Sequence, residues 1–403
     1  KQVVKHTAVR WSNVLREGTE NNGLSTFDAL DENILPFDMG ALRKLQQTSK
    51  VQEQGNIMLA IGEQQTASLY LGEVQVVGAS QNAFLASSPN VIGTVNVLKG
   101  DFGTTMPTSV TEYRGTVLWY DINNGRWIQY ASNGLFPISS YKMTRFWKQW
   151  SIQFLSMTAA QIEVFGGRPF VFATVDPAHD ELLISIPQLT FDPPKGYLPT
   201  YPTHYTPFIP SPPVFPFDIL DFRGKTIVYD LKYSRWRGSF SFAPEGFSVL
   251  QNQLYSFKSG QLYLHNQQNQ CNYYGVQYNP RVMYVPNIEP TMPKSYNAIG
   301  VRSNIVPLFT VLYNLYPYQQ LTDLLDYDYR DIEGIWYATF RRNIMQPTAT
   351  GYTATSLLTG EKMRGVTMMA MLEFSVNTVP LELKFIDIDF SISHGHVPKT
   401  TSQ

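Results

Sequence analysis

Five acidic side chains between residues 323 and 333 form the densest group that could do chemistry. They are Asp323, Asp326, Asp328, Asp331 and Glu333. Carboxylates at this density could bind Ca²⁺ or supply the acid and base of a glycosidase. The segment lacks the glycine and the terminal glutamate of an EF-hand loop, and the sequence does not show that any two carboxylates converge. A solvated acidic loop is the simpler interpretation, because most charged side chains lie at the surface.

The other reactive residue types are sparse. His394 and His396 could hold a metal through two imidazoles, but the sequence offers no evident third ligand. Cys271 is the single cysteine, which excludes an internal disulfide, and we expect a neutral thiol. No glycine-rich phosphate loop and no GxSxG nucleophile motif occurs, and Arg341 and Arg342 are too isolated for a nucleic-acid stripe. The sequence therefore predicts no enzyme active site, no metal site and no cofactor.

The composition is typical of a β-rich chain with extensive protein–protein contact. The 403 residues carry a formal net charge of -1, so charge gives no sign of a nucleic-acid or lipid-binding surface. Charged residues make up only 16%, whereas aromatic residues make up 14% and include 24 tyrosines, which favour interfaces. No run of about 18 apolar residues occurs, and we therefore predict no membrane insertion.

One hairpin motif occurs twice in the sequence. Residues 114–127 read RGTVLWYDINNGRW, and residues 223–236 read RGKTIVYDLKYSRW. Both copies predict an outgoing strand, a turn and a returning strand. The aspartate can accept hydrogen bonds from turn amides, and the tryptophan is large enough to cover the side of a sheet. We therefore assign a structural role to Tyr120, Asp121, Trp127, Tyr229, Asp230 and Trp236.

Short strands recur along much of the chain. Hairpins are also predicted over 168–185 and 253–265, and β-branched and aromatic segments cut by glycine and asparagine begin at Asn56. Repeated four-stranded units of about 40–50 residues mark a β-propeller. We therefore expect a mainly β fold, a β-propeller or propeller-like antiparallel sheets. A sandwich or a set of linked sheets is the alternative.

A short N-terminal helix and one or two inserted helices are expected to interrupt this pattern. Helix formers over 41–47, with Asp38 as a plausible N-cap, predict a short N-terminal helix. Residues 137–158 carry apolar side chains at helical spacing and predict an inserted helix with Ser139 or Ser140 as its cap. The aromatic-rich run within this second segment is also compatible with a strand.

The C-terminal part resumes the strand pattern, with one irregularity. Over 381–392 the apolar residues switch from one face to the other, and Asp387 and Asp389 then share the polar face. A bulge near Phe385 would explain the switch. We divide the whole chain into an arm with a helix, a propeller-like region, and a C-terminal β region that would complete the propeller, over 1–55, 56–300 and 301–403.

Several of these segments resemble the tail muzzle or nozzle proteins of crAss-like phages. The similar stretches are strand–turn motifs rather than a catalytic signature, and they lie at 61–73, 90–104, 114–143, 223–236, 252–266, 333–343 and 357–365. The resemblance implies a virion structural protein at the end of a short tail. Identical subunits would form a ring that closes the DNA channel and opens for genome ejection. A chain that starts at Lys1 would fit a protein cut during maturation.

The resemblance also implies partners and a lumen. The partners would be identical subunits in a ring, other tail and portal-proximal proteins, and viral DNA that passes without sequence-specific binding. A basic lining would retain DNA, so we expect the acidic segment 323–333 or the face with Asp387 and Asp389 to lie toward the lumen.

The alternative function is recognition of a host receptor or glycan. Residues 187–217 carry many prolines and interleaved aromatic residues, which predict an extended projecting loop that packs on a neighbour. Exposed aromatic side chains suit stacking on sugar rings. The loop would be solvent-exposed and dispensable for assembly if it binds the host, and buried between subunits if it is structural.

Overall fold

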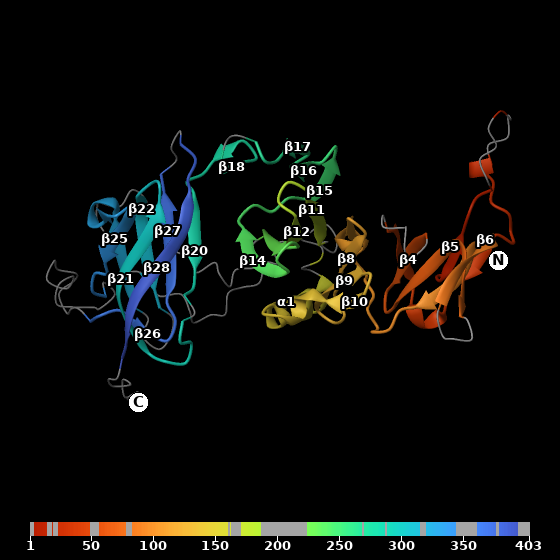
Figure 1. The fold of residues 1–403 in the computed structure, drawn as a ribbon, viewed down its shortest axis with the longest axis horizontal. Coiled ribbons are helices and arrows are strands. Elements are labelled where there is room, and N and C mark those ends of the chain that lie inside the picture. The colour runs from red at the N-terminus through yellow and green to blue at the C-terminus, as the bar shows by residue number, and fades with distance from the viewer. Residues whose placement is uncertain are drawn as a thin grey trace. The chain divides into compact units, whose positions relative to one another are not determined.

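A computed structural model shows a chain whose regular structure is mostly antiparallel strands, with one α-helix among the described residues (Figure 1). The structure describes residues 4–13, 18, 23–48, 56–77, 83–159, 162, 171–186, 224–267, 270–286, 288–314, 320–343, 361–375 and 379–393. The mainly β prediction is confirmed. The chain divides into two compact units, Lys1–Asn266 and Gln267–Gln403.

The first unit contains four consecutive antiparallel meanders, in which each strand pairs with the next. Meander 1 comprises β3 (Leu42–Gln47), β4 (Ile57–Gly62), β5 (Thr66–Val77) and β6 (Ala83–Val97). Meander 2 comprises β7 (Thr111–Tyr113), β8 (Thr116–Asp121), β9 (Arg126–Ala131) and β10 (Gly134–Pro137). Meander 3 comprises β11 (Phe172–Asp176), β12 (Glu181–Ile186), β13 (Lys225–Asp230) and β14 (Arg235–Phe240). Meander 4 has three strands, β15 (Gly246–Leu250), β16 (Gln253–Lys258) and β17 (Gln261–Leu264).

The meanders pack face to face in chain order. Successive side chains of a strand point to opposite faces, so an apolar strand can pack on two neighbours. In β8, Trp119 belongs to the core shared with meander 1, whereas Leu118 belongs to the core shared with meander 3. In β12, Ile184 faces meander 2 and Leu183 contributes to the small core with Leu254 of meander 4. Consecutive apolar residues in these strands therefore build a stack of sheets.

An N-terminal arm covers the outer face of meander 1. The arm contains β1 (Ala8–Arg10), which pairs with β2 (Glu32–Ile34), and the short 3-10 helices η1 (Gly23–Ser25) and η2 (Phe37–Met39). Its buried side chains pack on the face of meander 1 that points away from meander 2, and they are Val9, Leu35 and Met39.

The predicted N-terminal helix over 41–47 is wrong. Residues Leu42–Gln47 form strand β3, whose half-buried and exposed residues alternate and which pairs with β4. Asp38 lies inside η2 instead of capping an α-helix. Helix propensity is a weak preference, and a six-residue segment gains more from backbone pairing with a neighbouring strand.

The predicted inserted helix is confirmed as α1 (Thr144–Leu155). Its N-cap residue is Met143, so the expected serine cap is wrong. Ser139 lies in the 3-10 helix η4 (Ile138–Ser140), and its hydroxyl accepts a hydrogen bond from the backbone N–H of Trp127 at 3.0 Å. A further 3-10 helix, η3 (Pro107–Ser109), precedes β7.

The second unit is a pair of antiparallel sheets around one core. One sheet contains β20 (Arg281–Tyr284), β22 (Pro307–Tyr313), β23 (Leu321–Leu325) and β27 (Met369–Phe374). The other contains β21 (Lys294–Ser303), β24 (Arg330–Ile332), β25 (Ile335–Thr339), β26 (Arg364–Gly365) and β28 (Leu383–Ile392). A small pair, β18 (Asn272–Tyr273) with β19 (Val276–Gln277), and the 3-10 helix η6 (Asp326–Asp328) complete the unit. Leu312 and Leu372 from the first sheet meet Ile299 and Ile388 from the second.

The irregularity predicted in the last strand is confirmed. The register of β28 against β21 shifts between Phe385, opposite Arg302, and Leu383, opposite Ser303. Beyond the shift, Ile388 points into the core while Asp387 and Asp389 are exposed.

The division of the chain differs from the predicted regions. Along the chain, the boundary between the compact units follows Asn266, whereas the sequence placed a boundary at residue 300. Residue 300 lies inside β21, which pairs with β25 and β28 in the sheet to which it belongs.

The propeller remains a prediction. The sheets formed by the described residues do not close on themselves, although meanders 1 to 3 have the four-stranded form expected of blades. Among the described residues, no helix has the length and apolar character needed to cross a membrane.

Candidate functional site

The first repeated hairpin is stabilised by a buried aspartate in its turn. Asp121 Oδ1 accepts hydrogen bonds from the backbone N–H groups of Asn123 and Asn124 at 3.0 and 3.1 Å. Its Oδ2 accepts a third from Asn124 Nδ2 at 2.7 Å. Burial raises the pKa of the Asp121 carboxyl, and these hydrogen bonds oppose the rise. The sequence-based role of Asp121 as a turn acceptor therefore matches the geometry.

Two hairpins of meander 3 use the same device. Asp230 Oδ1 accepts a hydrogen bond from the backbone N–H of Tyr233 at 3.0 Å. Asp176 Oδ1 accepts one from the backbone N–H of Ala178 at 3.0 Å. Each aspartate ends its outgoing strand, where a carboxylate can satisfy turn amides that have no ladder partner.

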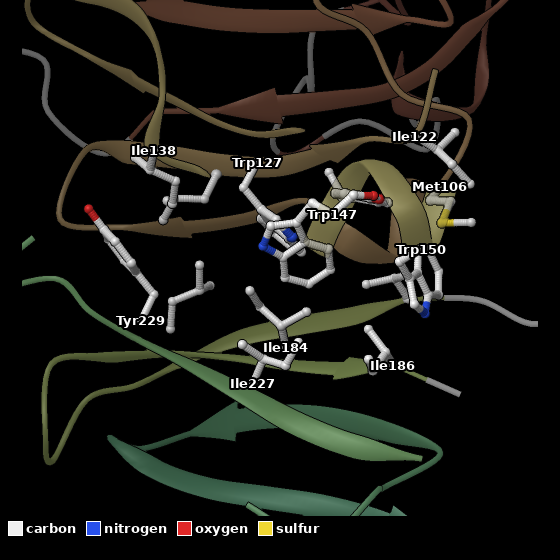
Figure 2. Close-up of a cluster of buried hydrophobic side chains, with 14 of the residues drawn as sticks. Met106, Ile122, Trp127, Ile138, Trp147, Trp150, Ile184, Ile186, Ile227 and Tyr229 are labelled. Atoms are coloured by element: carbon white, nitrogen blue, oxygen red, sulfur yellow. The ribbon is translucent and has the colours of Figure 1, made fainter. Parts of the chain in front are cut away.

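The two repeated tryptophans contact the same residue of α1. The ring centroids of Trp127 and Trp236 each lie 5.8 Å from that of Trp147. Trp127 is fully buried and Trp236 is partly buried in the same core. Figure 2 shows Trp127 and Trp147 side by side above Ile184 of meander 3. The hairpin repeat thus places one tryptophan from meander 2 and one from meander 3 against a shared helix.

The tyrosines of the repeat complete this aromatic cluster. Tyr120 lies 5.4 Å from Trp127 between ring centroids, and Tyr229 lies 4.9 Å from Trp236. The Tyr120 hydroxyl also lies 2.6 Å from the Ser151 hydroxyl of α1. Burial raises the pKa of Tyr120, so its phenol stays protonated. All six predicted hairpin residues therefore serve packing or turn geometry.

Meander 3 also carries a row of buried carboxylates whose alignment the sequence did not predict. Asp176, Glu181 and Asp230 are opposite one another on adjacent strands and are each 4–6% exposed. Arg237 forms an ion pair with Glu181, and Asn266 donates to both oxygens of Asp176. Only strand register brings these positions together, because the hairpin motif marks Asp230 alone and says nothing of its alignment with Asp176 and Glu181.

A serine–histidine pair lies in the adjoining meander 4. Ser256 Oγ is 2.6 Å from His265 Nε2, and Asp176 lies close enough to affect the histidine electrostatically. Burial lowers the pKa of His265, with the Asp176 charge opposing this. A serine beside a histidine is the pairing used in nucleophilic catalysis. The Ser256 side chain is fully buried, so the hydroxyl has no access to solvent in this structure.

The predicted acidic cluster is divided among separate structural contacts. Asp328 forms an ion pair with Arg341 at 2.6 Å and accepts the backbone N–H of Leu325 at 2.8 Å. Asp323 lies 3.6 Å from Arg341, and burial raises its pKa while the arginine charge lowers it. These two carboxylates share one arginine.

The remaining acidic residues lie in local turns. Asp326 Oδ1 accepts the backbone N–H of Tyr327 at 2.9 Å, and Asp331 Oδ1 accepts that of Gly334 at 3.0 Å. Glu333 occupies a turn position with φ of 54°. Across the described residues, no group of three or more histidine, cysteine or acidic side chains could hold a metal ion.

Cys271 is half-buried, and burial raises the pKa of its thiol, as expected for a neutral thiol. His394, His396 and the segment 187–217 lie outside the described residues.

Within the first unit, the stack ends at meander 4 in an apolar face that no other described element of this unit covers. Strand alternation directs five apolar side chains away from meander 3, and they are Leu250, Tyr255, Phe257, Leu262 and Leu264. Four of them are exposed and Tyr255 is half-buried. We call this surface the end face. It is the best candidate for a functional surface, because grouped exposed apolar residues mark interaction sites.

Comparison of the chain with protein-family models finds no match, and comparison with curated proteins finds none either.

Proposed function

We propose that this chain is a structural virion protein at the end of a short phage tail. Identical copies would form a ring that closes the DNA channel and opens for genome ejection. The resemblance of its strand–turn segments to crAss-like muzzle proteins motivates the proposal. The structural observation that supports it is a stack of meanders that ends in an uncovered apolar face.

A stack of this kind suits a channel wall. Meanders 2 and 3 have both faces covered by neighbouring sheets, and the Tyr-Asp-Trp hairpins join them through α1. Stacked modules that contact only their neighbours form rigid extended walls. The meanders would serve as the blades of a propeller-like domain, with their edges protected by packing.

The charge distribution supports a lumen that does not retain DNA. Asp387 and Asp389 are exposed on the outer face of the sheet of β21, and Arg302 and Arg330 share that face by register. Opposite charges therefore balance locally, and the surface lacks the cationic excess that binds DNA through counterion release. We propose that this face or the acidic segment 323–333 lines the lumen. A density map of the assembled tail that places both on the outer wall would contradict this part of the proposal.

Immunogold electron microscopy tests the location. An antibody raised against this chain should label the far end of short-tailed particles. Label on lateral fibres would instead support the alternative, a host-receptor or glycan-binding protein. Absence of label from all particles would overturn the virion assignment.

A further inference from the structure

We propose that the end face binds the N-terminal arm of a second copy of this chain, so that copies join head to tail. The inference rests on the proposed function, because it names the surfaces through which one ring subunit would meet the next.

The end face resembles the apolar sheet faces that pack on one another inside the stack, but it has no covering layer from the described residues of the first unit. Phe257 and Leu262 lie directly opposite each other on β16 and β17 and are 43% and 54% exposed. Tyr255 and Leu264 form the adjacent cross-strand pair. The other residues of this face, all of them described, are Gly246, Ser248, Leu250 and Gln253, so it carries no charge. Burying such a face costs no desolvation of ions.

The inner faces of the stack show what normally covers such a surface. Meander 2 buries Trp119 against meander 1 and Leu118 against meander 3, both at 0% exposure. The opposite face of meander 4 packs on meander 3 through Leu254, which is 2% exposed. The end face therefore continues a series of contacts in which apolar sheet faces are covered by another apolar layer.

The N-terminal arm carries the complementary surface at the other end of the stack. Leu30 and Phe37 are 92% and 89% exposed, the highest values for large apolar side chains among the described residues. Phe27 and Ile34 are 58% and 61% exposed. Leu35, the neighbour of Ile34, is buried against meander 1. The arm thus covers its own stack with its buried residues and exposes other apolar residues, next to the exposed carboxylates Asp28 and Asp38.

Head-to-tail contact covers both surfaces with a single kind of interface, whereas self-pairing would need one contact between end faces and another between arms. A self-pairing of two end faces would leave both arms exposed, whereas an arm on an end face leaves one surface of each kind for the next copy. Together the two patches expose on the order of 1,000 Å² of side-chain surface, about the smallest area of a stable interface. A heterologous contact of this type generates a ring when its rotation closes.

Paired charge substitutions test the contact. One variant carries Phe257→Glu and Leu262→Glu, and the other carries Leu30→Glu and Phe37→Glu. Ile152→Glu is the matched control, since Ile152 is 66% exposed on α1 and belongs to neither patch. Light scattering across a concentration series should give multiples of 45.8 kDa for the wild type and the control, and a monomer for each paired variant. A wild type that stays monomeric overturns the inference.

Mixing the two paired variants tests the geometry. Each retains the surface that the other lacks, so an equimolar mixture should form one contact and stop at a dimer. Self-pairing of end faces predicts that the arm variant still dimerises alone and that mixing adds nothing, which would overturn the inference.

A cross-link tests the same contact without added charge. In a Cys271→Ala background, Leu262→Cys and Phe37→Cys placed on separate chains should form an intermolecular disulfide. With both cysteines on one chain, a disulfide confined to the monomer would show that the arm folds back on its own end face and would overturn the inference.

These outcomes separate the two proposals. Head-to-tail dimers in solution without label at the tail end would refute the proposed function alone. Label at the tail end, with paired variants that still assemble, would refute the contact alone.

Discussion

At the scale of single residues, the hairpin repeat is explained by local hydrogen bonding and by one shared contact. Asp121 and Asp230 accept turn amides, a role that the sequence predicts because donor and acceptor are separated by only two or three residues. Trp127 and Trp236 both contact Trp147, although the three residues lie in distant segments of the chain. No sequence pattern predicts this contact.

Trp127→Ala should lower the free energy of unfolding by about 3–5 kcal/mol, because it removes a fully buried indole from a close-packed core. Urea denaturation followed by circular dichroism measures the loss. Trp236→Ala is the matched control and should cost less, since that ring is only partly buried. A loss below about 1 kcal/mol for Trp127→Ala would mean that the hairpin tryptophan is exposed.

Asp121→Asn should change how stability depends on pH. Burial raises the folded-state pKa of Asp121 above its ordinary value of 3.8, so folding favours the protonated form. That stabilisation is complete below pH 3.8 and is lost as pH rises through the folded-state pKa. The free energy of unfolding of the wild type, measured relative to Asp121→Asn, should therefore fall as pH rises from about 3.8 toward neutrality. A difference that stays constant or increases contradicts the assignment.

At the scale of elements, strands were predictable where a pattern of a few neighbouring residues identifies them. Alternation and turn residues located both repeated hairpins, and the parity switch located the bulge of β28. The helix prediction for residues 41–47 failed because this segment pairs with β4 in the fold. Strand pairing outweighs the intrinsic helix propensity of its residues.

Gly125→Ala should be more costly than Gly260→Ala. Both glycines have positive φ in hairpin turns, at 61° and 73°, so either substitution carries backbone strain of about 1–2 kcal/mol. A Cβ on Gly125 would also lie 2.9 Å from Lys148 Cα in α1, whereas one on Gly260 would meet nothing within 4 Å. Overpacking should add about 1–3 kcal/mol at Gly125 in urea denaturation. Equal losses would mean that the turn moves away from the helix without cost.

At the scale of the whole molecule, the two units have separate cores. The core with Leu118 draws only on residues before 266, and the core with Leu312 draws only on residues after it. Domains with their own cores usually unfold as separate cooperative units.

Calorimetry should therefore resolve two unfolding transitions. Leu312→Ala, at a residue with 0% exposure, should destabilise one transition by about 2–5 kcal/mol and leave the other unchanged. Leu118→Ala, equally buried, should act on the other transition. A single transition that both substitutions shift would show that the units unfold together.

The sequence by itself determined the features that depend on near neighbours in the chain. These are the mainly β class, the hairpins, the turn aspartates, the inserted helix and the bulge, because alternation, turn chemistry and helical spacing act over a few residues.

The tertiary structure alone decided what depends on distant residues. Strand pairing made β3 a strand, strand register aligned Asp176 with Glu181 and Asp230, and packing brought both repeated tryptophans to Trp147. It also decided which apolar sheet face of the first unit stays uncovered, because the order of the sheets determines which one lies at the end.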